Sequence, residues 1–88
     1  MIKLIGGDGS SEDNAIVIQN AENEKDGVDT EYELVAKYFG VEDGDWGIVD
    51  QSFIQNDITW KCYDILYIEN REGKQYTIFF DMTDFFGK

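Results

Sequence analysis

The chain has 88 residues, of which 19 are acidic and 7 are basic, so its formal net charge is −12. Its six Phe, five Tyr and two Trp argue against disorder and its length permits one modest core, so residues 1–88 are predicted to form a single globular domain. The absence of histidine excludes His-activated serine or cysteine nucleophiles, and a single cysteine excludes an internal disulfide and paired-cysteine zinc sites.

The first part of the chain alternates short apolar runs with polar segments. Residues 1–5 predict a short strand, which the Gly-rich segment 6–11 ends. Residues 15–18 are an apolar, largely β-branched run (Ala-Ile-Val-Ile) that predicts a buried strand. Residues 19–28 are polar and acidic, and we expect a loop there.

Residues 30–39 carry the clearest helix pattern. Thr30 and Glu33 have the spacing of a capping box, in which each side chain accepts a hydrogen bond from a backbone N–H of the first turn. Gly40 is suited to the left-handed residue that ends a helix, and Val41 is expected to make the apolar contact that accompanies such a cap. Apolar residues at spacings of three and four predict one broad buried face, formed by Tyr32, Val35 and Phe39.

The remaining residues predict three strands joined by turns. The alternation that starts at Ile58 becomes apolar on both faces near residue 65, which is typical of a central strand. The predicted elements are a turn at 42–46, strands at 48–54, 58–68 and 75–81, a hairpin turn at 70–73, and a terminal helical turn at 83–87 that places two Phe against the sheet. The order β-β-α-β-β-β predicts an α+β domain, a small antiparallel sheet of four to five strands with one helix on one face.

The acidic residues gather in the first part of the chain. Fourteen acids against three lysines give residues 1–57 a net charge of −11. One interpretation is solubility alone. The other is a docking face for a basic protein, as in an inhibitor, an immunity protein or a nucleic-acid mimic. On this second hypothesis the predicted partner-binding residues are Glu22, Glu24, Asp26, Asp29, Glu31 and Glu33.

An alternative hypothesis is a module that binds a small ligand or, weakly, calcium. The candidate oxygen ligands are Asp8, Asp43 and Asp45, which lie in Gly-containing segments without the full spacing of a calcium-binding loop. A phosphate site in the Gly-rich segment is disfavoured, because no lysine precedes its serines and acidic residues lie beside it. No metal or cofactor is expected otherwise.

Catalysis is not expected, because the candidate carboxylates have simpler explanations. Glu31 and Glu33 are two apart on a helix and face different directions, while Asp81 and Asp84 are expected to end a strand and cap a turn. Cys62 is predicted to be a small buried strand residue rather than a reactive thiol.

Trp46 and Trp60 are each either core residues or binding anchors. In a chain with a small core, burial is the more frequent explanation for a tryptophan. An exposed tryptophan beside acidic residues would instead indicate a protein-binding hot spot.

Basic residues are too few for several kinds of partner. The one close basic pair, Arg71 and Lys74, falls in a predicted turn, so we expect no direct binding to nucleic acid or to an anionic membrane. A free thiol without a disulfide framework, no signal-peptide pattern and no apolar run of about 18 residues predict a cytoplasmic protein.

Several short motifs spread along nearly the whole chain resemble those of a set of small bacterial proteins of unknown function. These motifs are Gly6–Ser11, Ala15–Ile18, Glu31-Tyr32, Asp45-Trp46, Gln51-Ser52 and the closing segment Phe80–Lys88. The resemblance implies a bacterial, free-standing, intracellular protein. It carries over no activity, cofactor or catalytic residue.

Overall fold

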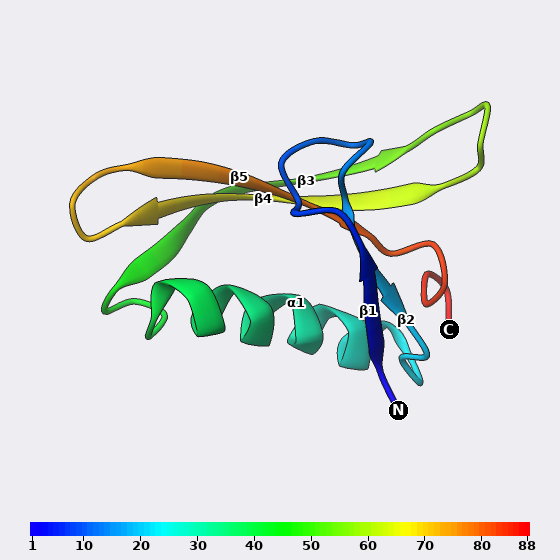
Figure 1. Ribbon diagram of the computed structural model, residues 1–88, viewed down its shortest axis with the longest axis horizontal. Coiled ribbons are helices and arrows are strands. Elements are labelled where there is room, and N and C mark those ends of the chain that lie inside the picture. The colour runs from blue at the N-terminus through cyan, green and yellow to red at the C-terminus, as the bar shows by residue number, and fades with distance from the viewer.

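The computed structural model describes residues 1–88 and contains five strands and one helix in the order β-β-α-β-β-β (Figure 1). The elements are β1 (Lys3–Gly6), β2 (Ile16–Gln19), α1 (Glu24–Phe39), β3 (Trp46–Gln55), β4 (Cys62–Asn70) and β5 (Gln75–Asp81). The predicted α+β class and element order are confirmed, and α1 crosses one face of the sheet.

The sheet has the strand order β1-β2-β5-β4-β3 and is mixed rather than purely antiparallel. β3, β4 and β5 form an antiparallel meander, and β1 pairs antiparallel with β2. β2 lies parallel to β5, with Ile16 opposite Phe80. The expectation of an all-antiparallel sheet is corrected here, because the crossover through α1 and the meander bring the last strand back beside the second.

The helix begins at Glu24, six residues before the predicted start, so the second half of the expected loop at 19–28 is helical. Asn23 is the N-cap, and its Oδ1 accepts a hydrogen bond from the N–H of Asp26 at 2.8 Å. Asp26 in turn accepts one from the N–H of Glu22 at 3.1 Å. Thr30 is an interior residue whose hydroxyl donates to the carbonyl of Asp26 at 2.9 Å.

Gly27 explains how this part of the helix approaches the rest of the chain. It is buried inside the first half of α1, and a Cβ at this position would lie 2.5 Å from ring atoms of Phe85. Phe85 is fully buried in the turn after β5. A glycine that costs helix propensity therefore permits the aromatic ring to seat directly against the backbone.

The end of the helix agrees with the prediction at Gly40 but not at Val41. Gly40 has φ 102° and donates its N–H to the carbonyl of Ala36 at 2.9 Å. The side chain of Val41 is 70% exposed, so the expected apolar contact is absent. Its N–H instead donates to Asp45 Oδ2 at 2.8 Å.

The predicted strand from Ile58 begins only at Cys62, because residues 56–61 form the loop of the β3–β4 hairpin. The other strand predictions agree better: 48–54 lies inside β3, and 75–81 coincides with β5. In the terminal turn Phe85 is buried, while Phe86 is half-exposed and stacks on Phe53 of β3 with ring centroids 5.2 Å apart.

The core lies between α1 and the sheet. Its fully buried members include Val35 of α1, Leu66 and Ile68 of β4, and Phe80 of β5. Cys62 is also buried there as a free thiol, as the sequence predicted. The Gly-rich loop before β2 also bonds to the β5 edge that pairs with β2, since the N–H of Phe79 donates to the carbonyl of Gly9 at 2.8 Å.

Candidate functional site

The six acidic residues predicted to bind a partner do not form one open surface. Glu22 and Glu33 are exposed. Three others already have partners within the chain: Glu24 Oε1 accepts from Gly87 N–H at 2.9 Å, Asp26 Oδ2 from Glu22 N–H at 3.1 Å, and Asp29 Oδ2 from Lys25 Nζ at 2.8 Å. These bonds support the start of the helix but leave Glu24 and Asp29 exposed, so the acidic face stays a prediction for the acids other than Glu31.

Glu31 is removed from that surface altogether, and its prediction as a partner contact is wrong. Its side chain is fully buried. A helix that begins at Glu24 places Gly27, Glu31 and Val35 on one inner face at spacings of four. Neither carboxyl oxygen of Glu31 receives a hydrogen bond, and its neighbour is the buried carboxyl of Asp64 on β4.

The Glu31–Asp64 pair holds a proton. Burial, the hydrogen bond to Asp64 and the charge of Asp64 together raise the pKa of Glu31 to about 10. At neutral pH Glu31 is therefore protonated and donates to Asp64, whose two oxygens also accept from Gln51 Nε2 at 3.0 and 3.2 Å. With Glu31 fully enclosed, the pair links the helix to the sheet and offers no surface to a substrate.

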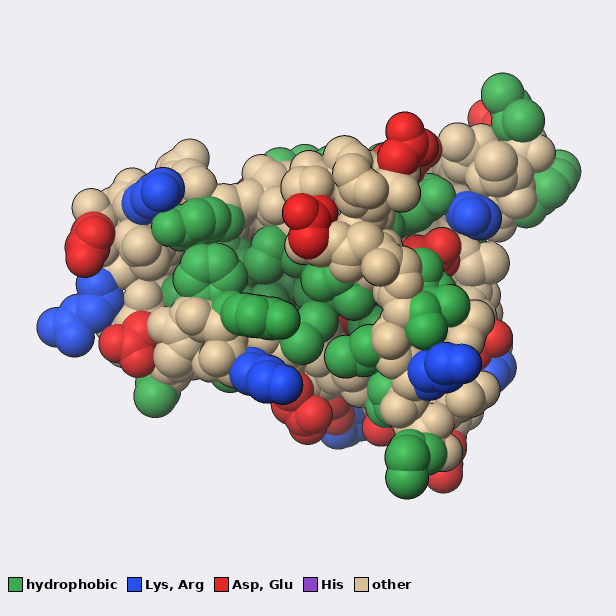
Figure 2. Space-filling view, in the orientation of Figure 1, with side chains coloured by type: hydrophobic (Ala, Val, Ile, Leu, Met, Phe, Trp, Pro, Cys, Tyr) green, Lys and Arg blue, Asp and Glu red, His purple; other side chains and the backbone are tan.

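The two tryptophans have opposite environments. Trp46 is 3% exposed and its Nε1 donates to the carbonyl of Gly40 at 2.9 Å, so it is a core residue. Trp60 is 71% exposed and lies in the β3–β4 hairpin loop with Ile58, which is 90% exposed. Residues 56–61 are called the hairpin tip below. Figure 1 shows this loop projecting from the body, and Figure 2 shows hydrophobic side chains at the same projecting end.

The hairpin tip is held in one shape by Asn56. Asn56 Oδ1 accepts from the N–H groups of Ile58 and Thr59 at 2.9 and 3.0 Å. The carbonyl of Asn56 accepts from the N–H of Trp60 at 2.8 Å, and Trp60 has φ 63°, a conformation that few side-chain-bearing residues adopt. The exposed apolar pair is therefore presented by an ordered loop.

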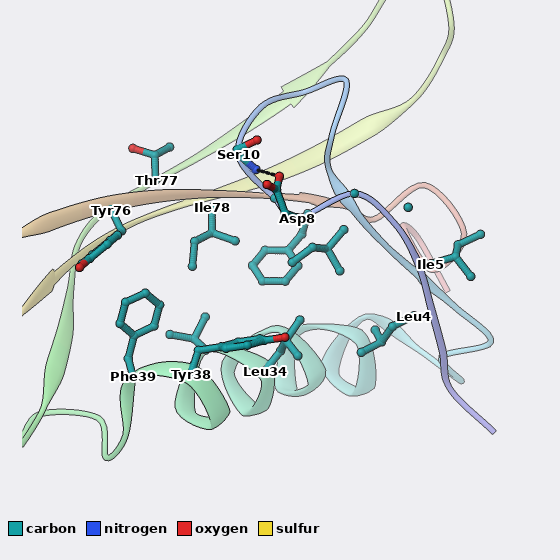
Figure 3. A pocket seen from close by; sticks show the side chains of 16 residues that line it. Leu4, Ile5, Asp8, Ser10, Leu34, Tyr38, Phe39, Tyr76, Thr77 and Ile78 are labelled. Atoms are coloured by element: carbon teal, nitrogen blue, oxygen red, sulfur yellow. Dashed lines mark hydrogen bonds between the residues drawn. The ribbon is translucent and has the colours of Figure 1, made fainter.

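A second apolar feature is a groove between α1 and β5, with a volume of about 570 Å³. Figure 2 shows it as a hollow of hydrophobic side chains in the middle of the visible face, and Figure 3 shows its lining. We call it the α1–β5 groove. Leu34, Tyr38 and Phe39 line it from the helix, Tyr76 and Ile78 from β5, and Leu4 and Ile5 from β1.

Asp8 is the one charged residue in the lining of this groove. Its Oδ1 accepts a hydrogen bond from the N–H of Ser10 at 3.0 Å, and hydrogen bonds from Ser10 hold the pKa of Asp8 below its usual value. Asp8 takes part in none of the three ion pairs of the chain. A carboxylate at this position disfavours an anionic ligand.

The structure does not bring the three calcium candidates together. Asp43 and Asp45 lie in the turn between α1 and β3, whereas Asp8 lines the α1–β5 groove. Asp45 is engaged by the N–H of Val41 and lies 3.8 Å from Arg71. No group of three or more His, Cys, Asp or Glu side chains is placed to hold a metal ion. A single site built by these three aspartates is therefore not formed.

The remaining chemical candidates have structural roles. Asp81 Oδ1 accepts from the N–H of Thr83 at 3.0 Å, and Asp84 Oδ2 accepts from the N–H of Asn20 at 2.8 Å, so both fix the chain after β5. Burial raises the pKa of the Cys62 thiol, which keeps it protonated near neutral pH.

Comparisons with protein-family models, with curated proteins and with solved structures gave no match to this chain. The resemblance to small bacterial proteins therefore stays a prediction. No helix of the structure is long and apolar enough to cross a membrane.

Proposed function

We propose that this chain is a non-catalytic binding protein that docks on a basic partner protein through the hairpin tip. The observation that carries the proposal is the exposure of Trp60 and Ile58 on an ordered loop. Tryptophan is enriched among residues that dominate binding energy at protein interfaces. A role in solubility alone does not explain an exposed tryptophan side chain.

The ordered shape of the hairpin tip favours tight docking. Asn56 fixes the loop backbone through bonds to three N–H groups, those of Ile58, Thr59 and Trp60. A loop that is ordered before binding loses little conformational entropy when it docks. Asn56 Nδ2 also donates to Glu12 Oε2 at 3.3 Å, which ties the tip to the loop between β1 and β2.

The negative charge of the chain favours a positively charged partner. The chain carries −12, and although Asp57 is balanced by Lys61 within the tip, Glu12 is bonded to its anchor Asn56. A strongly negative chain attracts a positively charged protein over several ångströms and repels nucleic acid and anionic membranes. The exposed acids Glu22, just before the helix, and Glu24, Asp29 and Glu33 within it add to this long-range attraction. The buried free thiol of Cys62 suits a reducing compartment, and we place the protein in the cytoplasm on that basis.

The proposal is tested by capturing proteins from a native lysate with the tagged chain at low and at high salt. Wild type is compared with Trp60→Ser and Ile58→Ser. Two controls replace residues that are also mostly exposed elsewhere, Tyr38→Ser for the aromatic and Val41→Ser for the aliphatic.

The expected result is a basic protein bound at low salt, weakened at high salt, lost with the two tip variants and retained with both controls. Capture that survives Trp60→Ser, or that both sets of variants reduce equally, contradicts docking through the tip. An acidic captured protein contradicts the charge argument.

A further inference from the structure

The α1–β5 groove has the size and lining of a small-molecule site. Its volume of about 570 Å³ lies within the range of roughly 300–1,000 Å³ that is usual for ligand pockets. Ten of its sixteen lining residues are hydrophobic, including Leu34, Phe39 and Ile78 from the two facing elements. Binding of an apolar ligand body in such a groove is favourable, because it removes apolar surface from water.

Asp8 determines which polar group such a ligand would carry. It is the only charged residue of the lining, it is exposed to solvent, and it has no cationic partner in the chain. Figure 3 shows Asp8 on the loop opposite Tyr38, with its carboxylate turned toward Ser10 at the edge of the groove. A carboxylate at an apolar surface in a chain of net charge −12 favours a cation and disfavours an anion.

Tyr38 at the edge of the groove also favours a cationic ligand. Tyr38 is 75% exposed and its ring borders the groove, where the face of a tyrosine attracts a nearby ammonium or guanidinium group. The chain already uses this interaction once, since Lys74 Nζ lies 5.3 Å from the ring centroid of Tyr76. Tyr38 makes no such contact, so the face of its ring is available to a cationic ligand.

The loop that carries Asp8 is fixed in place. The N–H of Gly9 donates to the carbonyl of Asn14 at 2.7 Å, and its own carbonyl accepts from Phe79 of β5 at 2.8 Å. Gly9 has φ 82°, and a Cβ there would lie 3.0 Å from Ile78 and 3.1 Å from Ile16. The glycine therefore lets the loop sit directly on the apolar lining, so that Asp8 is positioned before any ligand arrives.

We propose that the α1–β5 groove binds a small amphipathic cation, a molecule with an apolar body held between α1 and β5 and one ammonium or guanidinium group bound by Asp8. This proposal does not rest on the docking function of the hairpin tip. The two sites use different residues, and each can fail while the other holds.

The test is a titration of the full-length chain, followed by backbone-amide NMR, with octylammonium and octanoate as probes. The two share an apolar chain and differ in the sign of the head group. Asp8→Asn is compared with Asp13→Asn, which makes the same change in net charge on the same loop but lies outside the lining. Asparagine at position 8 can still accept the hydrogen bond from Ser10.

We expect octylammonium to bind wild type about tenfold or more tightly than octanoate, with the largest shifts at Gly7, Gly9 and Ile78. Asp8→Asn should abolish this preference, while Asp13→Asn and Trp60→Ser should keep it. Equal affinity for the two probes, equal effects of the two asparagine variants, or shifts confined to the hairpin tip would overturn the proposal. Tighter binding of a Leu-Lys peptide than of octylammonium would reassign the groove to a protein segment.

Discussion

The first half of α1 packs closely on the C-terminal turn and on β4, whereas the second half borders the open α1–β5 groove. In the first half Gly27 lies against Phe85, and Glu31 shares a proton with Asp64. In the second half the larger side chains of Leu34 and Phe39 line a space of about 570 Å³. The comparison teaches that the two halves of one helix are packed differently: the first half is held closely against the C-terminal turn and β4, and the second half borders an open groove.

The largest expected effect on stability is where the first half of α1 packs on the C-terminal turn. Phe85→Ala empties a fully buried site and should lower the free energy of unfolding by about 3–5 kcal/mol. Phe39→Ala, on the groove side, removes a half-buried ring and should cost about 1–2 kcal/mol. Urea unfolding of both variants measures the difference, and equal losses would break the comparison.

Glu31→Gln should stabilise the protein. Unfolded Glu31 ionises near its ordinary pKa of 4.5, whereas folded Glu31 holds its proton up to a pKa of about 10. Folding therefore takes up a proton between these values, and stability falls as pH rises through this window. At pH 7 the substitution should raise the free energy of unfolding by about 2–3 kcal/mol, with the gain vanishing below pH 4.5.

Urea unfolding at pH 4, 5.5, 7 and 8 measures this effect. An unchanged pH dependence in Glu31→Gln would show that the Glu31–Asp64 pair is ionised in the folded chain. Glu33→Gln, an exposed change of the same kind on the same helix, is the control and should leave the pH profile nearly unaltered.

Gly27→Ala should destabilise the chain although alanine is the better helix former. The added Cβ meets the ring of Phe85 at 2.5 Å, and this overpacking exceeds the gain in helix propensity, for a net loss of about 1–2 kcal/mol. Adding Phe85→Leu should make the loss from Gly27→Ala smaller, because the two positions are in contact. A stabilised Gly27→Ala variant would mean that the helix stands farther from the turn.

The smallest effects on stability are expected at the two exposed aromatic residues. Tyr38→Ser and Trp60→Ser should each change the free energy of unfolding by less than about 0.5 kcal/mol, because both side chains are mostly in water. Thermal or urea unfolding checks this. A loss above 2 kcal/mol at either position would assign that residue to the fold rather than to binding.

The sequence predicts the α+β class and most strands because their patterns are local. Residues 75–81 alternate cleanly, and Gly40 ends the helix as expected. The start of the helix is missed because residues 19–28 are polar and acidic, and the role of Gly27 appears only when Phe85 is brought against it. The parallel pairing of Ile16 with Phe80 joins residues 64 positions apart, which no local pattern encodes.

The candidate sites depend even more on long-range packing. Alternation from Ile58 predicts that Trp60 lies in a strand, but the loop held by Asn56 extends through residue 61 and delays the strand to Cys62. The Gln-Asn-Asp run at 55–57 is the one local signal for that turn. Glu31 lies four residues before Val35 and so shares its buried face, and the α1–β5 groove is assembled from segments with no shared motif.

The most direct test of the docking function is the affinity of the captured basic protein, once purified, for wild type and for two tip variants at two salt concentrations. Trp60→Ser should weaken binding by about 30-fold or more at both salts, because it removes the side chain that the partner would bury. Asp57→Asn should weaken it chiefly at low salt, because it removes only screened attraction. An unchanged affinity of Trp60→Ser would contradict the account.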